Sequence, residues 1–179
     1  MVVLRRGLFG LAVVAGLALS ATTTWAGGAV RSADAGYFDR PGIWRGLYGG
    51  VNLGHFDADH DDGLVGGVQV GYNWQNQAIV YGLEGDISIA NSDVIDWLGS
   101  VRGRLGYLLQ PGLMVYGTAG VGVVSANDSD ASFVWGLGVE GRVTDNMTAR
   151  LEYLNFDTDT HHGDGVSVIR AGLNFKFGR

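Results

Sequence analysis

The sequence has no cysteine and only two prolines among its 179 residues. Without cysteine, the chain can form neither a disulfide framework nor a lipid anchor on a cysteine. Basic residues are also few, because 12 Lys and Arg stand against 18 Asp and Glu, for a net charge of −6. Phosphate binding needs a basic surface, so this charge argues against nucleic acid as a partner.

Long apolar runs are absent outside the N-terminus. There, Arg5 and Arg6 precede an apolar stretch over residues 7–19, and small residues lead up to Ala26. This stretch is shorter than the roughly 20 apolar residues of a transmembrane helix. The layout is that of a secretory signal peptide, so we expect residues 1–26 to be cleaved during export.

Glycine, in contrast, is abundant, with 31 residues. This composition disfavours helices, because an interior glycine costs about 1 kcal/mol relative to alanine. From Leu64 to Gln75 the chain reads LVGGVQVGYNWQ, a period-two alternation that is typical of a strand with unlike faces. The same pattern recurs in segments long enough to cross a bilayer at a tilt. The expected strands are 45–56, 64–75, 79–90, 96–109, 113–124, 132–144, 148–157 and 166–177.

The two faces of these strands predict what surrounds the sheet. In the third strand Tyr81, Leu83 and Ile87 share one face, whereas Glu84 and Asp86 lie on the other. All mid-strand charges fall on the face that carries the glycines, which is the opposite of a water-soluble barrel. An apolar exterior around a charged interior is stable in hydrocarbon. The sequence therefore predicts an all-β fold, an eight-stranded antiparallel up-and-down transmembrane β-barrel.

The inward charges predict a lumen filled by ion pairs. Eight strands enclose a space that side chains can fill, and buried charge is costly unless it is paired. A turn near residue 94 places Glu84 opposite Arg104 and Asp86 opposite Arg102. The next charged hairpin, centred near Asn146, makes diagonal neighbours of two further pairs, Glu140 with Arg150 and Arg142 with Glu152. The predicted lumen network comprises Glu84, Asp86, Arg102, Arg104, Glu140, Arg142, Arg150, Glu152 and Arg170.

The stretch HFDADHDDG at residues 55–63 is the most acidic part of the chain. Asp57, Asp59 and Asp61 have the spacing of a calcium loop, but the glycine comes one position late and Val68 replaces the glutamate of the twelfth position. We interpret it as the first of four acidic extracellular loops, at 57–63, 91–95, 125–131 and 157–165. A surface metal site stays open as an alternative, on His55, His60, His161 and His162 with the loop aspartates.

In these segments the chain resembles the small eight-stranded outer-membrane barrels of Gram-negative bacteria, the group of the OmpA membrane domain and the opacity-type, porin-like surface proteins. The residues that carry the resemblance are GLYGGVNLGHF (46–56), YGLEGDISIA (81–90), WLGSVRGRLGY (97–107), VYGTAGVGV (115–123), WGLGVEGRVTDNMTARLEYL (135–154) and VIRAGLNFKFG (168–178). The resemblance implies that the barrel-assembly machinery reads the aromatic end of the last strand, here Phe175 and Phe177, after periplasmic chaperones have delivered the chain.

We expect a structural, envelope-stabilising protein of the cell outer membrane, in contact with lipid and lipopolysaccharide, because the filled lumen disfavours a channel and the loops are shorter than those of dedicated adhesins. Three alternatives stay open: a small low-conductance porin, a surface adhesin or ligand-binding barrel, for example for haem, and a lipid A-modifying enzyme. The enzyme hypothesis lacks support, because Ser167 faces outward and His162 does not have the H-x-S spacing of such enzymes. We expect no enzymatic activity, no cofactor, and residues 45–179 as the barrel. Residues 27–44 form either a periplasmic arm or part of a plug.

Overall fold

The computed structural model describes residues 43–58, 61–91, 97–125, 129–158 and 165–178. The expected signal peptide, most of the segment 27–44 and three of the four histidines lie outside these ranges. In the part of the chain that is described, no helix is long and apolar enough to cross a membrane. The strands are β1 (Gly46–Ala58), β2 (Asp61–Asn76), β3 (Ile79–Asn91), β4 (Trp97–Gln110), β5 (Leu113–Ser125), β6 (Ser129–Arg142), β7 (Met147–Thr158) and β8 (Val166–Phe177).

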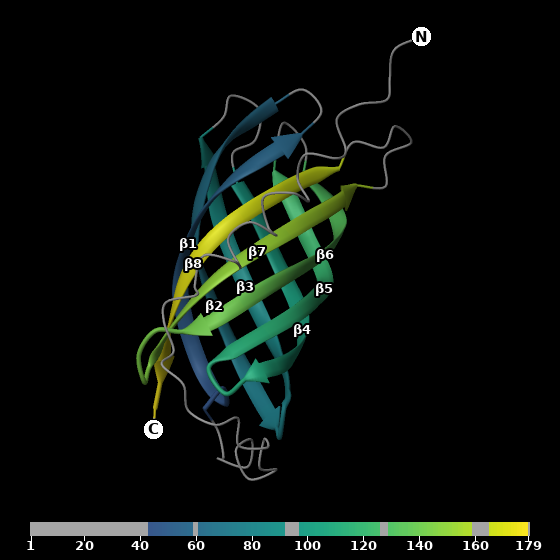
Figure 1. The fold of residues 1–179 in the computed structure, drawn as a ribbon. Helices are drawn as coiled ribbons and strands as arrows, with labels where there is room; N and C mark the ends of the chain where they lie inside the picture. The colour runs from purple at the N-terminus through teal and green to yellow at the C-terminus, as the bar shows by residue number, and fades with distance from the viewer. Residues whose placement is uncertain (1–42, 59–60, 92–96, 126–128, 159–164, 179) are drawn as a thin grey trace. The chain divides into compact units, whose positions relative to one another are not determined.

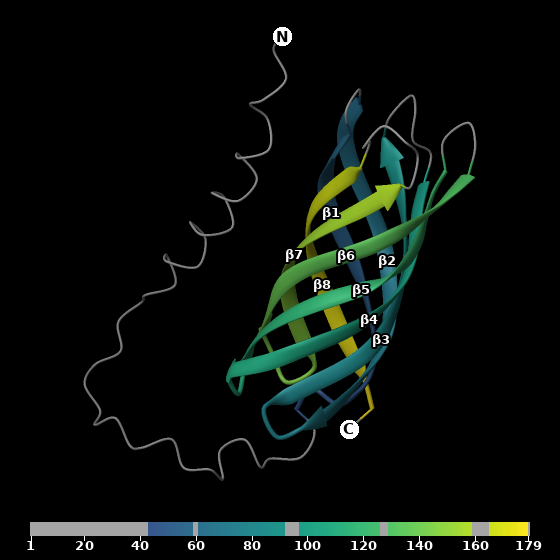
Figure 2. The ribbon, with the colours of Figure 1, turned by 90° about the vertical axis from the view of Figure 1, so that its right-hand side faces the viewer.

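The eight strands form one closed antiparallel barrel, in which each strand pairs with its neighbours in sequence and β1 pairs with β8 (Figure 1). Because the pairing register is staggered around the closed barrel, the strands are tilted relative to the barrel axis, as Figure 2 shows. Starting from Asp57 on β1, the row of paired residues passes through Ser167 and Asn155 and around the barrel. It returns to β1 at Leu47, ten residues away from its start. The predicted fold is confirmed.

The strand bounds differ from the predicted ones chiefly around the first connection. Pairing between β1 and β2 continues to Ala58 and Asp61, so only residues 59–60 lie between them. The predicted loop 57–63 was therefore too long, because both of its arms continue the backbone ladder instead of leaving it. Strand β6 likewise begins at Ser129, three residues earlier than predicted.

The barrel has two unlike ends. The turn end holds the tight connections at 77–78, 111–112 and 143–146, close to the predicted turns. At Gln77 the backbone takes the left-handed φ of 52°, which the turn requires. The other end, where the connections 59–60, 92–96, 126–128 and 159–165 join the strands, is called the loop end.

The outer wall is apolar, as predicted. Leu137 and Val101 are each 63% exposed, and Ile89 is 72% exposed. The charged side chains of mid-strand positions, among them Arg102 and Glu152, point inward and are buried. Such a polarity requires hydrocarbon around the barrel, since water would leave this apolar surface unburied.

The lumen itself consists of three layers. The loop-end layer is an apolar cluster of Phe56, Val65, Leu98, Val124, Val134, Leu154, Phe156, Val166 and Val168. The turn-end layer is a second apolar cluster, of Trp44, Val80, Leu108, Met114 and Tyr116. Between these two clusters lie the inward-facing charged and amide side chains, which we call the charged layer. The sequence predicted the charged layer but neither of the two apolar layers that enclose it.

Candidate functional site: the charged layer of the lumen

Glu84 on β3 is the centre of the charged layer. Its carboxylate oxygens lie 2.7 Å from Arg102, 2.5 Å from Arg150, 3.6 Å from Arg104 and 3.9 Å from Arg170. All four arginines of the layer therefore share one carboxylate, although they come from three different strands. The shared carboxylate joins β7 and β8 to β3 across the lumen and β4 to its neighbour β3.

The remaining acids each bind at least one of these arginines. Asp86 accepts hydrogen bonds from Arg102 at 2.8 Å and from Arg170 at 2.9 Å. Glu152 accepts one from Arg170 at 2.8 Å. The ion pair between Asp86 and Arg170 joins β3 to β8, and these two strands are not neighbours in the sheet.

Arg104 lies between two aromatic rings. Its guanidinium carbon is 4.1 Å from the ring centre of Tyr116 and 5.7 Å from that of Tyr48. It also donates hydrogen bonds to Glu140 at 2.6 Å and to the Tyr48 hydroxyl at 3.0 Å. The Tyr48 hydroxyl in turn donates to Glu84 at 2.6 Å. Cation–π contact and ion pairing thus hold the same guanidinium, and the two tyrosines line the side of the layer that faces the turn end.

The charges of the layer balance. Four arginines face four carboxylates, and all of these side chains are nearly inaccessible to solvent. The members are Glu84, Asp86, Glu140 and Glu152 with Arg102, Arg104, Arg150 and Arg170. Because burying an unpaired charge costs several kcal/mol, a neutral and interlocked set is the arrangement that a buried lumen permits.

The register of the β3–β4 hairpin differs from the predicted one by two residues. Glu84 pairs with Arg102, and Asp86 pairs with Ser100, so the turn is centred one residue earlier than expected. The predicted contacts Glu84–Arg104 and Asp86–Arg102 still occur, but as diagonal neighbours. In the β6–β7 hairpin, Glu140 lies directly opposite Arg150, whereas the sequence predicted that they are diagonal neighbours.

Arg142 was assigned to the lumen network, and this prediction was wrong. It is the last residue of β6, at the rim of the turn end, where its side chain is 32% exposed. It donates to the carbonyl of Thr144 at 3.0 Å and binds the carboxylate of Asp145. These acceptors in the turn bind the Arg142 guanidinium at the rim, so the expected pair between Arg142 and Glu152 does not form.

Sequence reasoning also missed a chain of amides beside the charges. Ser88 donates to Asn52, Asn52 to Gln69, Gln69 to Asn174, and Asn174 to Glu140, with distances of 3.3, 2.6, 2.8 and 3.0 Å. The chain crosses from β3 through β1, β2 and β8 to β6. The period-two pattern placed these residues on the inner face, but their polar character alone did not show that they bond to one another.

Inward-facing glycines make room for the large side chains. A methyl group at Gly138 would lie 2.4 Å from the Tyr116 ring, and one at Gly71 would lie 2.4 Å from the Tyr48 hydroxyl. On the outer wall, a methyl group at Gly103 would meet nothing closer than 3.8 Å. The inner glycines are therefore a packing requirement of the layer, whereas this outer one is not.

Trp44, just before β1, closes the turn end. Its side chain is 2% exposed, and its indole nitrogen donates to the carbonyl of Pro111 at 3.0 Å. Its backbone nitrogen donates to the side chain of Gln75 at 3.0 Å. The sequence left residues 27–44 open between an arm and a plug, and at Trp44 the structure places an aromatic ring inside the barrel.

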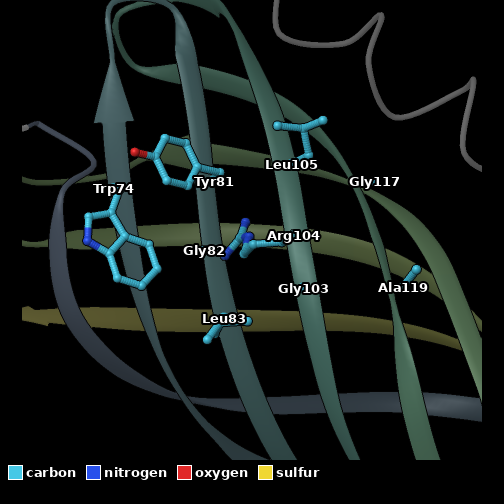
Figure 3. A pocket seen from close by; sticks show the side chains of 9 residues that line it. All are labelled: Trp74, Tyr81, Gly82, Leu83, Gly103, Arg104, Leu105, Gly117 and Ala119. Atoms are coloured by element: carbon cyan, nitrogen blue, oxygen red, sulfur yellow. The ribbon is translucent and has the colours of Figure 1, made fainter.

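The outer wall has a hollow of about 700 Å³ over β2 to β5. Figure 3 shows it between the side chains of Trp74, Tyr81, Leu83 and Leu105. The floor has almost no side chain, because it is formed by Gly103, Gly117 and Ala119. The hollow is mostly apolar, and Arg104 of the charged layer also borders it.

The remaining sequence-predicted residues lie on the outside. Phe175 and Phe177 project outward from β8 with their rings 5.5 Å apart. His55 lies 3.7 Å from Asp62, and both side chains are largely exposed. In the described ranges, no group of three or more His, Asp or Glu side chains could hold a metal ion. His60, His161 and His162 lie outside these ranges.

A closed eight-stranded barrel with an apolar outer wall and a paired, charged lumen defines the class of integral outer-membrane β-barrel proteins. A family model described as "Outer membrane protein beta-barrel domain" matches residues 9–177. The chain belongs to this family, and its place is the outer membrane.

Named relatives agree with this assignment. The chain is 39% identical over 168 residues to the 22 kDa outer membrane protein of Rhizobium leguminosarum bv. viciae, a match that covers 76% of this chain and 79% of that protein. It is 31% identical to the 31 kDa outer-membrane immunogenic protein of Brucella melitensis, over 75% of this chain and 84% of that protein. Neither name describes an enzyme.

Among solved structures, the outer membrane enzyme PagL superimposes with a TM-score of 0.50 at 10% sequence identity. The match covers 72% of this chain and 99% of PagL. At this identity the likeness shows the shared barrel fold and nothing of the chemistry.

Proposed function

We propose that this protein is a structural component of the outer membrane that conducts no solutes and that supports envelope integrity. The observation that carries the proposal is the filled lumen. A path along the barrel axis would have to pass the loop-end apolar cluster, the charged layer and the turn-end cluster with Trp44. An eight-stranded barrel has room for such a filling and for little else.

This filling argues against the porin alternative. A water-filled channel needs a polar lining along its whole length, and here two of the three layers are apolar. The charged layer does not provide a path either, because each of its carboxylates is bound by arginine. We therefore infer that an ion entering the lumen would have to break several ion pairs and displace packed side chains.

The enzyme alternative would need a nucleophile with a base beside it. Ser167 on β8 faces outward, and its hydroxyl would have to be that nucleophile. It shares a hydrogen bond with the Tyr153 hydroxyl at 3.0 Å and accepts one from the Asn155 amide at 3.2 Å. Neither partner is a base that takes up a proton near neutral pH. We infer that the protein modifies no lipid, and identical lipid A mass spectra from a deletion strain and its parent are the expected result.

The turn end faces the periplasm in this proposal, and the loop end faces the outside with its acidic connections. Surrounding lipid and lipopolysaccharide contact the apolar outer wall. Phe175 and Phe177 project from the last strand, where the barrel-assembly machinery would read them after delivery by periplasmic chaperones. An extracellular ligand such as haem is not needed to account for any described contact.

Two measurements test the structural role. Purified protein in planar bilayers is expected to show no steady conductance, and large, steady openings would contradict the filled lumen. A deletion strain is expected to become more sensitive to bile salts or vancomycin, and expression of the intact gene should restore resistance. Unchanged sensitivity together with silent bilayers would leave the fold correct but remove the envelope role.

A further inference from the structure

One sector of the outer wall breaks the apolar pattern. Near the loop end of β7, β8 and β1, the outward-facing side chains are Tyr153, Asn155, Ser167, His55 and Asp57. The register puts Asn155 opposite Ser167, and Ser167 opposite Asp57. On a lipid-facing wall, a polar side chain without a polar partner leaves its hydrogen-bonding groups unsatisfied in hydrocarbon, and this costs free energy.

An aromatic ring borders this sector. Trp135 on β6 lies opposite Asn155 in the register, and it is 40% exposed. Its ring meets the Tyr153 ring edge to face at 5.9 Å. We call Trp135, Tyr153, Asn155, Ser167 and Asp57 the wall patch. Hydrogen bonds between its own members hold the side chains of the wall patch in place. The hydroxyls of Tyr153 and Ser167 share one hydrogen bond, and the Asn155 amide donates another to Ser167.

Strands β3, β4 and β5 differ at the same end of the barrel. Outward positions near the loop end of β3, β4 and β5 are apolar, and Asn91 and Ser125 interrupt them only at the last residue of a strand. The apolar residues are Ile87, Ile89, Trp97, Val121 and Val123. On β7 and β1, by contrast, Asn155 and His55 lie before the last residues of their strands, so the polar sector, continued by Asp62 on β2, reaches further into the wall here than on β3 and β5. It belongs to one side of the protein.

We propose that the wall patch binds the uncharged saccharide headgroup of an outer-leaflet glycolipid. The Trp135 face offers a flat apolar surface to the C–H side of a sugar ring, while amide, hydroxyl and carboxylate groups beside it bond to sugar hydroxyls. Asp57 of the wall patch and Asp62, which lies opposite it on β2, disfavour an anionic phosphate headgroup. They accept hydrogen bonds from neutral hydroxyls without such repulsion.

The position of the patch fits a lipid-borne sugar. The patch faces the bilayer at the loop end, and the acyl chains of the same lipid would extend along the apolar wall below it. This assignment rests on the proposed orientation, in which the loop end faces outward. It does not depend on whether the lumen conducts, so bilayer recordings and measurements of glycolipid binding can fail independently of each other.

The test compares lipid selection by two double variants. Asn155→Leu with Ser167→Ala removes the hydrogen bonds of the wall patch. Asn91→Leu with Ser125→Ala makes the same two exchanges at outward positions outside the patch and serves as the matched control. Each protein is placed in nanodiscs of phosphatidylethanolamine with monoglucosyl diacylglycerol, and native mass spectrometry counts the glycolipids that remain bound after release from the disc.

The parent and the control variant are expected to retain glycolipid over phospholipid. The patch variant should lose about tenfold in this preference, since one or two hydrogen bonds are removed. Equal retention by the parent and the patch variant, or no preference in the parent, would overturn the proposal. Circular dichroism of each variant shows that the barrel has folded, so loss of binding is not confused with loss of structure.

Two further arms identify the source of the binding. In phospholipid nanodiscs without glycolipid, millimolar maltose should shift the side-chain amide resonances of Asn155 only weakly, because a free sugar lacks the acyl anchor. Chelation of divalent cations with EDTA should leave the glycolipid preference unchanged. If the preference disappears with EDTA, the patch binds phosphate through a bridging cation and the saccharide assignment is wrong.

Discussion

The charged layer and the two apolar layers fill the same lumen by different physical means. In the apolar layers, side chains from many strands pack mainly through the apolar surface that they bury, and Trp44 and Tyr116 of the turn-end cluster donate hydrogen bonds as well. In the charged layer, Glu84 is shared by four arginines, so the contribution of each residue depends on the others. The comparison indicates that the charged layer fixes the register of the strands, whereas the apolar layers seal its two sides.

The sharpest test of this difference is the removal of the shared carboxylate. Glu84→Ala leaves four buried arginines with three carboxylates, and we expect a loss of about 5 kcal/mol in unfolding free energy. Denaturant titration in lipid vesicles measures it. The double variant with Arg102→Ala restores neutrality and should be less destabilised than the sum of the single variants. Additive losses would show that the layer is not coupled.

The loop-end layer should behave additively. Phe156 is almost fully buried there, and Phe156→Ala is expected to cost about 4 kcal/mol through the lost burial and the remaining cavity. Combining this exchange with Glu84→Ala should give close to the sum of the two losses, since Phe156 belongs to the apolar cluster. A strong coupling energy in the same denaturant titrations would remove the distinction between the layers.

The turn-end layer depends on a residue that precedes the first strand. Trp44→Ala is expected to cost about 3 kcal/mol, because the ring and its hydrogen bond to Pro111 are both lost. Trp44→Phe keeps much of the ring but not the donor, and should cost about 1 kcal/mol. Equal losses in the two variants would mean that the hydrogen bond, and not the ring, closes this end.

Among the principal exchanges, the smallest expected change in stability comes from replacing a glycine of the inner wall, and a glycine of the outer wall serves as its control. Gly138→Ala forces a methyl group against the Tyr116 ring and should cost about 2 kcal/mol. Gly103→Ala, on the outer wall, adds a methyl group at ordinary contact distance and should change the stability little. Thermal unfolding in the same detergent ranks the two. A larger effect for Gly103 would contradict the inner wall as the tightly packed one.

The sequence alone determined the eight strands and the direction of their faces. Alternation with a period of two needs no tertiary information, because successive side chains of a strand point to opposite sides. The charges on the glycine face, such as Glu84 and Arg102, then required an apolar exterior in hydrocarbon. Both inferences agree with the structure.

The tertiary structure alone decided which charges meet. A shift of two residues in the register leaves every side chain on the same face, so the alternation could not distinguish Arg102 from Arg104 as the partner opposite Glu84. The contact between Asp86 and Arg170 depends on the closure of β8 onto β1, and the capture of Arg142 by Asp145 depends on where β6 ends. The position of Trp44 inside the barrel likewise follows from its hydrogen bonds to residues far along the chain, which no local pattern encodes.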